Sequence, residues 1–236
     1  VYTASEEEAD TDDLKFYTND GITGDMTSGY IITNTFAVPD ERIELTVNKV
    51  WEDNSTQAQR RPETIVINVK AENADNNDPE AIIDTYELNT ETETSHTFTG
   101  LKKYNSQGNE IQYTVEEQEK NPGDLHFYTT SVGTVENTYE NTKEVTITNT
   151  FEKPDDTTQV TVTKVWDDNN DEAQKRPQSI NLQLKNGNAI VKEQVVNVSN
   201  AVSGDTNTWQ YTFTDVEKYN EDGQEIVYTV DETEVN

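Results

Sequence analysis

A lysine, a glutamate and an asparagine interrupt apolar stripes that otherwise read as the inward faces of β-strands. In IELTVNKVW, residues 43–51, every second position faces the same side of a strand, and Lys49 shares that face with apolar neighbours. Glu117 follows the alternating stretch IQYTV, and Asn149 lies on the apolar face of VTITNTF. Because burying a lone charge costs several kcal/mol, we expect these three groups to meet and satisfy one another.

Two outcomes of that meeting are possible. One is a noncovalent cluster, in which the lysine and glutamate form a buried ion pair beside the asparagine amide. The other is chemical, because burial lowers the pKa of an amine and raises the pKa of a carboxyl group. A neutral amine can attack a carboxamide, while a protonated glutamate polarises the carbonyl group and passes protons to the departing ammonia. The product is an amide cross-link between the first and last strands, formed once and without a cofactor.

An internal repeat organises the chain. KVW occurs at Lys49 and again at Lys164, and 164 − 49 = 115. ITNTF occurs at residues 32–36 and 147–151 with the same offset of 147 − 32 = 115, and KYN followed by YTVEE returns as KYN followed by YTVDE. The repeat therefore spans about 115 residues, and the chain begins and ends out of phase with it.

The repeat predicts three segments. Residues 41–152 carry all of the signatures and are expected to form a complete domain. Residues 1–36 correspond to the C-terminal part of a preceding copy, and residues 159–236 correspond to the N-terminal part of a following copy. Proline with acidic and polar residues marks the linkers at 37–41 and 152–159.

Composition limits the classes of function. The chain has 47 acidic and 17 basic residues and a formal net charge of −30, which repels nucleic acids and anionic membranes. Runs of Val, Ile and Thr with 11 Tyr favour an all-β fold. There is no cysteine, and no apolar run is long enough for a membrane span or a signal peptide. We expect neither a nucleic-acid partner nor membrane insertion.

Other candidate sites are weak. The acidic loop that begins at Asp167 lacks the spacing of a calcium-binding EF-hand, and no metal site is expected. Trp51 and Trp166 fall on inward stripes and are predicted to be core residues. No glycine-rich phosphate loop and no pair of carboxylates in an open-cleft pattern stands out, so we expect neither a cofactor nor a multiple-turnover enzyme.

The order KVW, RP, KYN, YTVxE and ITNT resembles the Cna B-type (CnaB) domain of Gram-positive surface adhesins and pilins. The resemblance covers nearly the whole chain and implies tandem immunoglobulin-like β-sandwiches. It implies that a lysine of the first strand bonds to an asparagine of the last strand with the assistance of a glutamate. By motif these residues are Lys49 in KVW, Asn149 in ITNT and Glu117 in YTVEE.

The same motifs assign residues in the two outer segments. Asn34 and Glu6 are implied for the N-terminal segment, and Lys164 and Glu232 for the C-terminal one. Glu6 ends YTASE, in which Ala4 and Ser5 replace the usual residues of the motif. Each outer segment thus carries the glutamate with one of its two reaction partners.

These features predict a mechanical role. A bond between the first and last strands lies in the path of tension along the chain, so tandem copies would form a cross-linked stalk of a cell-wall-anchored surface adhesin outside a Gram-positive bacterium. The expected partners are adjacent repeats of the same or a neighbouring chain, with a host protein or glycan bound by regions beyond these residues. Two alternatives are a fibre subunit whose partial domains are completed by neighbouring chains, and a domain that itself binds a ligand.

Overall fold

The computed structural model describes residues 2–10, 12, 14–76 and 78–234. In these residues regular structure consists of sixteen strands and two short 3-10 helices, so the predicted all-β class is confirmed. The chain divides into two compact units, Val1–Asn54 with Arg61–Phe151, and Ser55–Arg60 with Glu152–Asn236. The expected division at 1–36, 41–152 and 159–236 stays a prediction.

The first ten strands belong to the first unit. They are β1 (Tyr17–Asp25), β2 (Gly29–Phe36), β3 (Arg42–Glu52), β4 (Thr64–Ala71), β5 (Ile82–Asn89), β6 (Ser95–Lys102), β7 (Tyr113–Glu119), β8 (Tyr128–Val132), β9 (Glu136–Tyr139) and β10 (Thr142–Phe151). The 3-10 helix η1 (Gln57–Arg60) falls between β3 and β4 in the sequence.

The remaining strands belong to the second unit. They are β11 (Thr157–Val165), β12 (Ser179–Asn186), β13 (Ala189–Asn197), β14 (Ala201–Val202), β15 (Asp205–Glu217) and β16 (Tyr228–Glu234), with η2 (Val198–Asn200) after β13. Three strands recur at the offset of the sequence repeat, because β11 begins 115 residues after β3 (157 − 42), β12 begins 115 residues after β4 (179 − 64) and β16 begins 115 residues after β7 (228 − 113). The repeat of motifs is therefore a repeat of strands.

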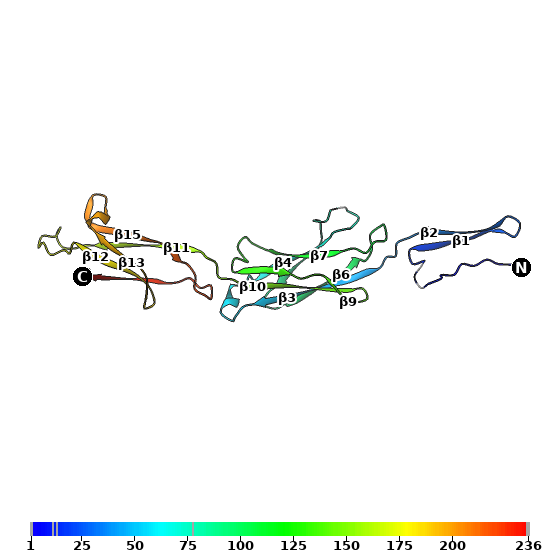
Figure 1. Cartoon of the computed structure of the whole chain (residues 1–236), viewed down its shortest axis with the longest axis horizontal. Helices are drawn as coiled ribbons and strands as arrows, with labels where there is room; N and C mark the ends of the chain where they lie inside the picture. The colour runs from blue at the N-terminus through cyan, green and yellow to red at the C-terminus, as the bar shows by residue number, and fades with distance from the viewer. Residues whose placement is uncertain (1, 11, 13, 77, 235–236) are drawn as a thin grey trace. The chain divides into compact units, whose positions relative to one another are not determined.

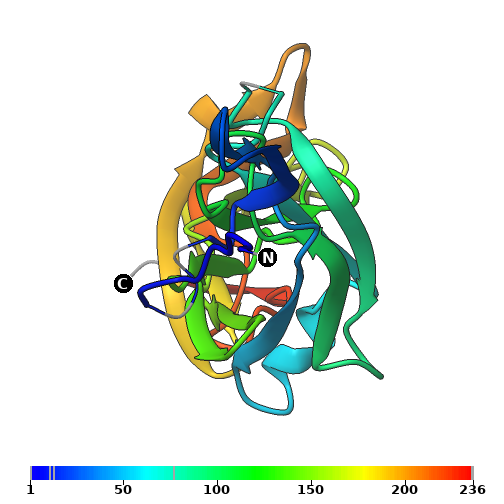
Figure 2. The ribbon, with the colours of Figure 1, turned by 90° about the vertical axis from the view of Figure 1, so that its right-hand side faces the viewer.

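The strands from β3 to β10 form a two-layer sandwich, coloured from blue-cyan to green in Figures 1 and 2. One sheet has the order β6-β3-β10-β8, with β9 added on β10, and the other has the order β5-β4-β7. Alternate residues of both sheets are buried in one core, as period-two patterning predicts. Its fully covered members include Leu45, Val47, Ile65, Ile67, Val69, Leu88 and Ile147.

The first and last strands of this sandwich, β3 and β10, are parallel neighbours and lie side by side in Figure 1. Their register sets Ile147 opposite Lys49 and Asn149 opposite Trp51. Side chains two residues apart on a strand share a face, so all four of these residues point into the sandwich. Lys49 and Asn149 are thus diagonal neighbours on adjacent strands.

Glu117 comes from the facing sheet. It lies on β7, which pairs with β4 so that Glu117 is opposite Ile67. Tyr113 and Val115 precede it on the buried face of the same strand, as alternation predicts. The sandwich therefore brings the carboxyl group across the core toward β3 and β10.

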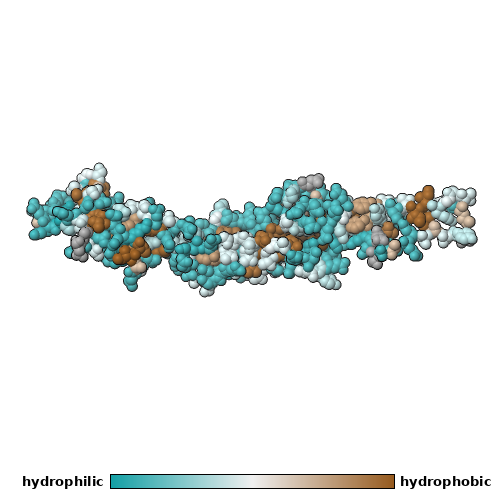
Figure 3. Space-filling view, viewed as in Figure 1, coloured by the Kyte–Doolittle hydropathy of each residue, from teal (hydrophilic) through white to brown (hydrophobic). Residues whose placement is uncertain are grey.

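The hairpin of β1 and β2 forms a separate two-stranded sheet. Its apolar side chains are largely exposed, and Figure 3 shows brown residues among the side chains near the N-terminal end. Tyr17 pairs with Phe36 in this hairpin, as Tyr128 pairs with Phe151 between β8 and β10. The hairpin is therefore the counterpart of β8 and β10 without the rest of a sandwich around it.

The second unit contains two three-stranded sheets, ordered β11-β15-β14 and β13-β12-β16. A smaller core lies between them and includes Leu182, Leu184, Val196, Trp209 and Phe213. Within residues 152–234, β11 pairs with β15 alone, whereas its counterpart β3 pairs with both β6 and β10. The β11 edge of this sheet is the position that β10 occupies in the first unit.

Candidate functional site

Lys49, Glu117 and Asn149 meet inside the sandwich of the first unit. The side chains of Lys49 and Glu117 are fully buried, and Lys49 Nζ lies 3.4 Å from Glu117 Oε2. Asn149 is also fully buried, and its Nδ2 donates a hydrogen bond of 2.6 Å to Glu117 Oε1. One carboxyl group thus contacts the lysine nitrogen with one oxygen and the amide nitrogen with the other.

Burial is the main influence on the lysine. It lowers the pKa of Lys49 from 10.5 to about 8, even though the negative charge and hydrogen bond of Glu117 act in the opposite direction. A free amine is therefore accessible near neutral pH, which an exposed lysine does not offer. This is the electrostatic condition for a lysine to act as a nucleophile.

The carboxyl group contacts the nitrogen of the amide, not its oxygen. Asn149 Oδ1 is buried and accepts no hydrogen bond from the described residues. Polarisation of the carbonyl group by Glu117, which the sequence suggested, is not seen in this arrangement. The contacts instead place the Glu117 carboxyl group between Lys49 Nζ and Asn149 Nδ2.

Three residues near the site were missed by sequence reasoning. Arg61 Cζ lies 5.2 Å from the centre of the Trp51 ring, over which Lys49 Nζ also lies at 4.1 Å. Asp53 Oδ2 accepts hydrogen bonds from Arg61 Nε at 2.8 Å and from the Tyr128 hydroxyl at 2.8 Å. The recurrence of Asp and RP in both copies, eight residues apart, was the available signal for Asp53 and Arg61.

Trp51 is only half-buried, so its prediction as a core residue needs correction. Its ring packs against the core, and Tyr128 meets it edge-on with ring centres 4.8 Å apart. The cations of Lys49 and Arg61 lie over the ring because its π-face carries negative charge density. Trp166 is half-buried in the same way, with Lys164 Nζ at 4.3 Å from the ring centre.

The hairpin segment brings Glu6 and Asn34 together. Asn34 Nδ2 donates to Glu6 Oε1 at 2.8 Å, the same contact that Asn149 makes with Glu117. Asn19 Nδ2 donates to the other carboxyl oxygen of Glu6 at 2.9 Å. No lysine nitrogen lies within 4 Å of the Glu6 carboxyl group among the ion pairs of the described residues.

The second unit brings Lys164 and Glu232 together. Lys164 Nζ lies 3.1 Å from Glu232 Oε2, and the two side chains are 24% and 41% exposed. The corresponding pair of the first unit is fully covered, because β10 closes the sheet beside β3 there. Each outer segment thus holds two members of the triad, and neither is as buried as the complete one.

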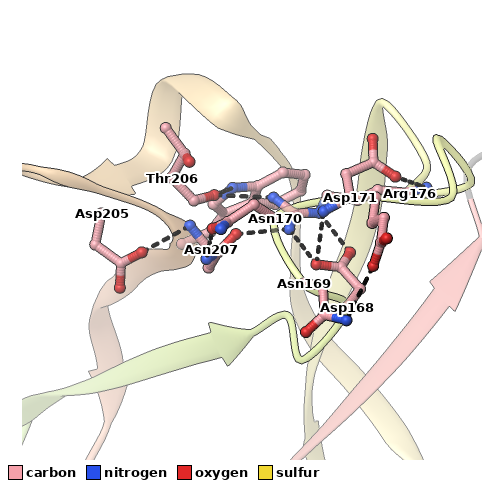
Figure 4. A network of polar contacts seen from close by, with 10 residues as sticks. Asp168, Asn169, Asn170, Asp171, Arg176, Asp205, Thr206 and Asn207 are labelled. Atoms are coloured by element: carbon pink, nitrogen blue, oxygen red, sulfur yellow. Dashed lines mark hydrogen bonds and ion pairs between the residues drawn. The ribbon is translucent and has the colours of Figure 1, made fainter.

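The acidic loop after β11 is organised by an arginine (Figure 4). Arg176 Nε donates to Asp168 Oδ2 at 2.9 Å, and Arg176 Nη2 donates to Asn207 Oδ1 at 2.7 Å. Asp171 accepts the backbone N–H of Arg176. Among the described residues, no group of three or more histidine or acidic side chains is arranged to hold a metal ion.

The first unit is a two-sheet all-β sandwich with a buried Lys, Glu and Asn on three strands, and comparison with known proteins identifies the family that has this fold. The family model described as Cna protein B-type domain matches residues 45–150 and 160–236. The chain therefore belongs to the Cna B-type domain family, and its fold is a tandem of immunoglobulin-like sandwiches. This confirms the family that the sequence motifs suggested.

The chain is also similar to one curated protein and to solved repeat units of Staphylococcus aureus. The chain is 32% identical over 206 residues to a collagen adhesin of Staphylococcus aureus, covering 87% of this chain and 14% of the relative. A solved single B repeat unit of the S. aureus collagen-binding surface protein is 32% identical, with 81% of this chain and 86% of that chain covered and a TM-score of 0.35. A solved pair of B repeat units is 30% identical, with 93% and 49% covered and a TM-score of 0.37.

The helices that the structure describes are short, and none is long and apolar enough to cross a membrane.

The depressed pKa of Lys49 predicts a pH-dependent stability in a variant that cannot react. In Asn149→Ala the lysine stays free. In the unfolded chain the Lys49 amine keeps its proton up to about pH 10.5, and in the folded chain it keeps it only up to about pH 8. Between these pH values the unfolded state therefore binds more protons than the folded state. The free energy of unfolding should therefore rise with pH across this window, by at most about 3 kcal/mol.

The matched control is Lys49→Met/Asn149→Ala, which lacks the titrating amine. Urea denaturation of both variants at a series of pH values measures the difference in their free energies of unfolding. As the pH rises from about 8 to about 10.5, the free energy of unfolding of Asn149→Ala should increase relative to that of the control. A difference independent of pH would contradict a depressed pKa for Lys49.

Proposed function

We propose that this chain is part of the stalk of a bacterial surface adhesin, and that its complete sandwich is stapled by an isopeptide bond between Lys49 and Asn149. The observation that carries the proposal is the contact of one buried carboxyl group with both nitrogens that the reaction exchanges. The family and the S. aureus relatives support the adhesin repeat role.

The chemistry follows from those contacts. Neutral Lys49 Nζ attacks the side-chain carbonyl carbon of Asn149, and the Nζ proton passes to Glu117 Oε2. The Glu117 carboxyl group, whose other oxygen is hydrogen bonded to Nδ2, then delivers this same proton to Nδ2 as the bond between that nitrogen and the carbonyl carbon breaks. One C–N bond forms, one breaks, and one ammonia leaves. The reaction occurs once per domain and needs no cofactor.

The bond would serve a mechanical purpose. β3 and β10 are the first and last strands of the sandwich and are parallel neighbours, so tension along the chain pulls them apart by shear. A covalent bond between their side chains carries that load without depending on redox conditions, and the chain contains no cysteine. Like a disulfide, it also restricts the unfolded state and stabilises the fold.

The setting follows from the relatives. The S. aureus relative is named a collagen adhesin, and this chain covers only 14% of it. We infer an extracellular, cell-wall-anchored position on a Gram-positive bacterium, with adjacent repeats as neighbours. Recognition of a host protein or glycan is assigned to regions outside these residues.

The bond predicts a specific mass deficit. The intact, denatured wild-type chain should be lighter than its sequence by one ammonia, and Lys49→Ala and Asn149→Ala should show no deficit. Glu117→Gln should slow the reaction by at least about 100-fold, because the shuttle of protons is lost.

Neighbouring residues supply matched controls for this experiment. Glu116 and Lys70 form an ion pair on the outer face of the same sheet, so Glu116→Gln and Lys70→Ala should keep the deficit of the wild type. A wild-type chain of full mass would contradict the covalent proposal and leave a noncovalent triad.

The bond also predicts a shorter extension under force. It would enclose 149 − 49 = 100 residues, which span roughly 340 Å when extended. Single-molecule stretching of Asn149→Ala should release this length on unfolding of the first unit, whereas the wild type should not. Equal extensions would contradict a bond that lies in the path of tension.

A second candidate function is supported by the two outer segments. Among the described residues, no lysine contacts the pair of Glu6 and Asn34, and no asparagine contacts the pair of Lys164 and Glu232. Within residues 152–234, β11 forms the edge of its sheet. The hairpin β1–β2 of one copy carries the strand and the asparagine that the β11 edge of another copy would need. On this proposal, neighbouring chains would join into a fibre.

Joining of chains predicts a covalent ladder. Concentrated wild-type protein should give denaturation-resistant dimers and higher multimers on a gel, and both Lys164→Ala and Asn34→Ala should remove them. Lys49→Ala should leave the ladder intact, because it changes only the complete sandwich. A chain that stays monomeric at high concentration would contradict the fibre proposal while leaving the stapled stalk untouched.

A further inference from the structure

The ring of Trp51 carries two cations. Lys49 Nζ lies 4.1 Å and Arg61 Cζ lies 5.2 Å from its centre. A cation over an aromatic face is stabilised by the negative charge of the π-system. That attraction favours the ammonium form of Lys49, which cannot act as a nucleophile. A second cation over the same ring opposes it, because like charges repel in a poorly solvated site.

Arg61 is fixed in this position by Asp53. The guanidinium Nε donates to Asp53 Oδ2 at 2.8 Å, and Nη2 forms the second arm of the fork to Oδ1 at 2.5 Å. The Asp53 side chain is 1% exposed, and the Tyr128 hydroxyl donates to it from β8. Because two guanidinium nitrogens of Arg61 are bound by the two oxygens of one buried carboxylate, its charge is held in place and is not that of a mobile surface group.

The second unit repeats the arrangement. Arg176 Cζ lies 5.3 Å from the centre of the Trp166 ring, with Lys164 Nζ over the same ring. Asp168 holds Arg176 with the same fork, through Nε at 2.9 Å and Nη2 at 2.5 Å. In each copy the arginine follows its aspartate by eight residues. The KVW and RP motifs are therefore joined in one structural unit in both copies.

We propose that Arg61 is a positioning residue for the reaction of Lys49. The charge of Arg61, fixed over the Trp51 ring, disfavours the ammonium form of Lys49 over the same ring and so favours its neutral amine. This inference rests on the proposed isopeptide bond and adds a residue that acts on its nucleophile without touching the reacting atoms. The electrostatics agree in direction: burial lowers the pKa of Lys49 most, the charge and hydrogen bond of Glu117 raise it, and Arg61 lowers it by a smaller amount that Asp53 opposes.

The charged groups that face Lys49 are few among the described residues. Glu117 approaches from β7, and Asp53 and Arg61 follow β3. Asn149 on β10 and Tyr128 on β8 are neutral at the pH of the reaction. Replacing Arg61 by glutamine removes one positive charge from this set and leaves the carboxylates in place.

The test follows ammonia loss as a function of pH. Precursor chains of the wild type, Arg61→Gln, Arg61→Lys and Arg176→Gln are purified in urea, refolded near about pH 5.5 to keep the amine protonated, and started by a jump to a series of pH values. Intact mass gives the rate at each pH, and tryptophan fluorescence before the jump establishes that each variant has folded.

Arg61→Gln should move the midpoint of the rate profile about one pH unit upward, so that its rate near neutral pH falls about tenfold while its rate at high pH approaches that of the wild type. Arg61→Lys keeps the charge and should stay close to the wild type. Arg176→Gln makes the same change in the other unit and should leave the profile unchanged.

Three outcomes would overturn the inference. If both Arg61 variants slow the reaction equally at every pH, Arg61 acts only by packing. An unchanged profile for Arg61→Gln would also contradict a role of the charge. If Arg61→Gln does not fold, the Arg61→Lys profile decides, and a shifted midpoint in that variant, which keeps the charge, would contradict the same role. Failure of the wild type to lose ammonia would instead refute the isopeptide bond itself, and this inference with it.

Discussion

A lysine and a glutamate with no exposed side-chain surface lie in a core built from Val, Ile, Leu and aromatic residues. Removing two charges from water costs several kcal/mol for each, and their mutual attraction offsets this only where the geometry and the remaining hydrogen bonds are favourable. The carboxyl group of Glu117 meets this requirement by contacting both Lys49 and Asn149. Conversion to an amide would lower this cost, because the side chain of Lys49 could then no longer carry a charge in the core.

The sandwich is arranged so that this cluster forms. β3 and β10 are parallel neighbours, which sets Asn149 diagonal to Lys49, and β7 brings Glu117 from the facing sheet. The outer segments show what the complete arrangement adds. Within residues 152–234, β11 has a neighbouring strand on one side only, and the side chains of Lys164 and Glu232, which meet in this unit, remain partly exposed. The complete burial of the lysine therefore accompanies the presence of the last strand beside it.

The motifs of the family therefore have distinct physical roles. KVW supplies the lysine and the aromatic ring beside it, YTVEE supplies the carboxyl group, and ITNT supplies the amide. RP provides the arginine that Asp53 fixes over the tryptophan. Two copies within one chain share this last arrangement although their loops differ, since Tyr128 supports Asp53 in one and Asn207 supports Arg176 in the other.

The sequence by itself determined the all-β class, the 115-residue repeat and the family, because alternation of apolar residues and recurrence of motifs are properties of the linear chain. It also placed Lys49, Glu117 and Asn149 on inward faces. Only the tertiary structure decided that Glu117 contacts the amide nitrogen, that Trp51 is half-buried, and that Arg61 shares its ring with Lys49. These contacts depend on strand register and loop geometry, which a period of two does not encode.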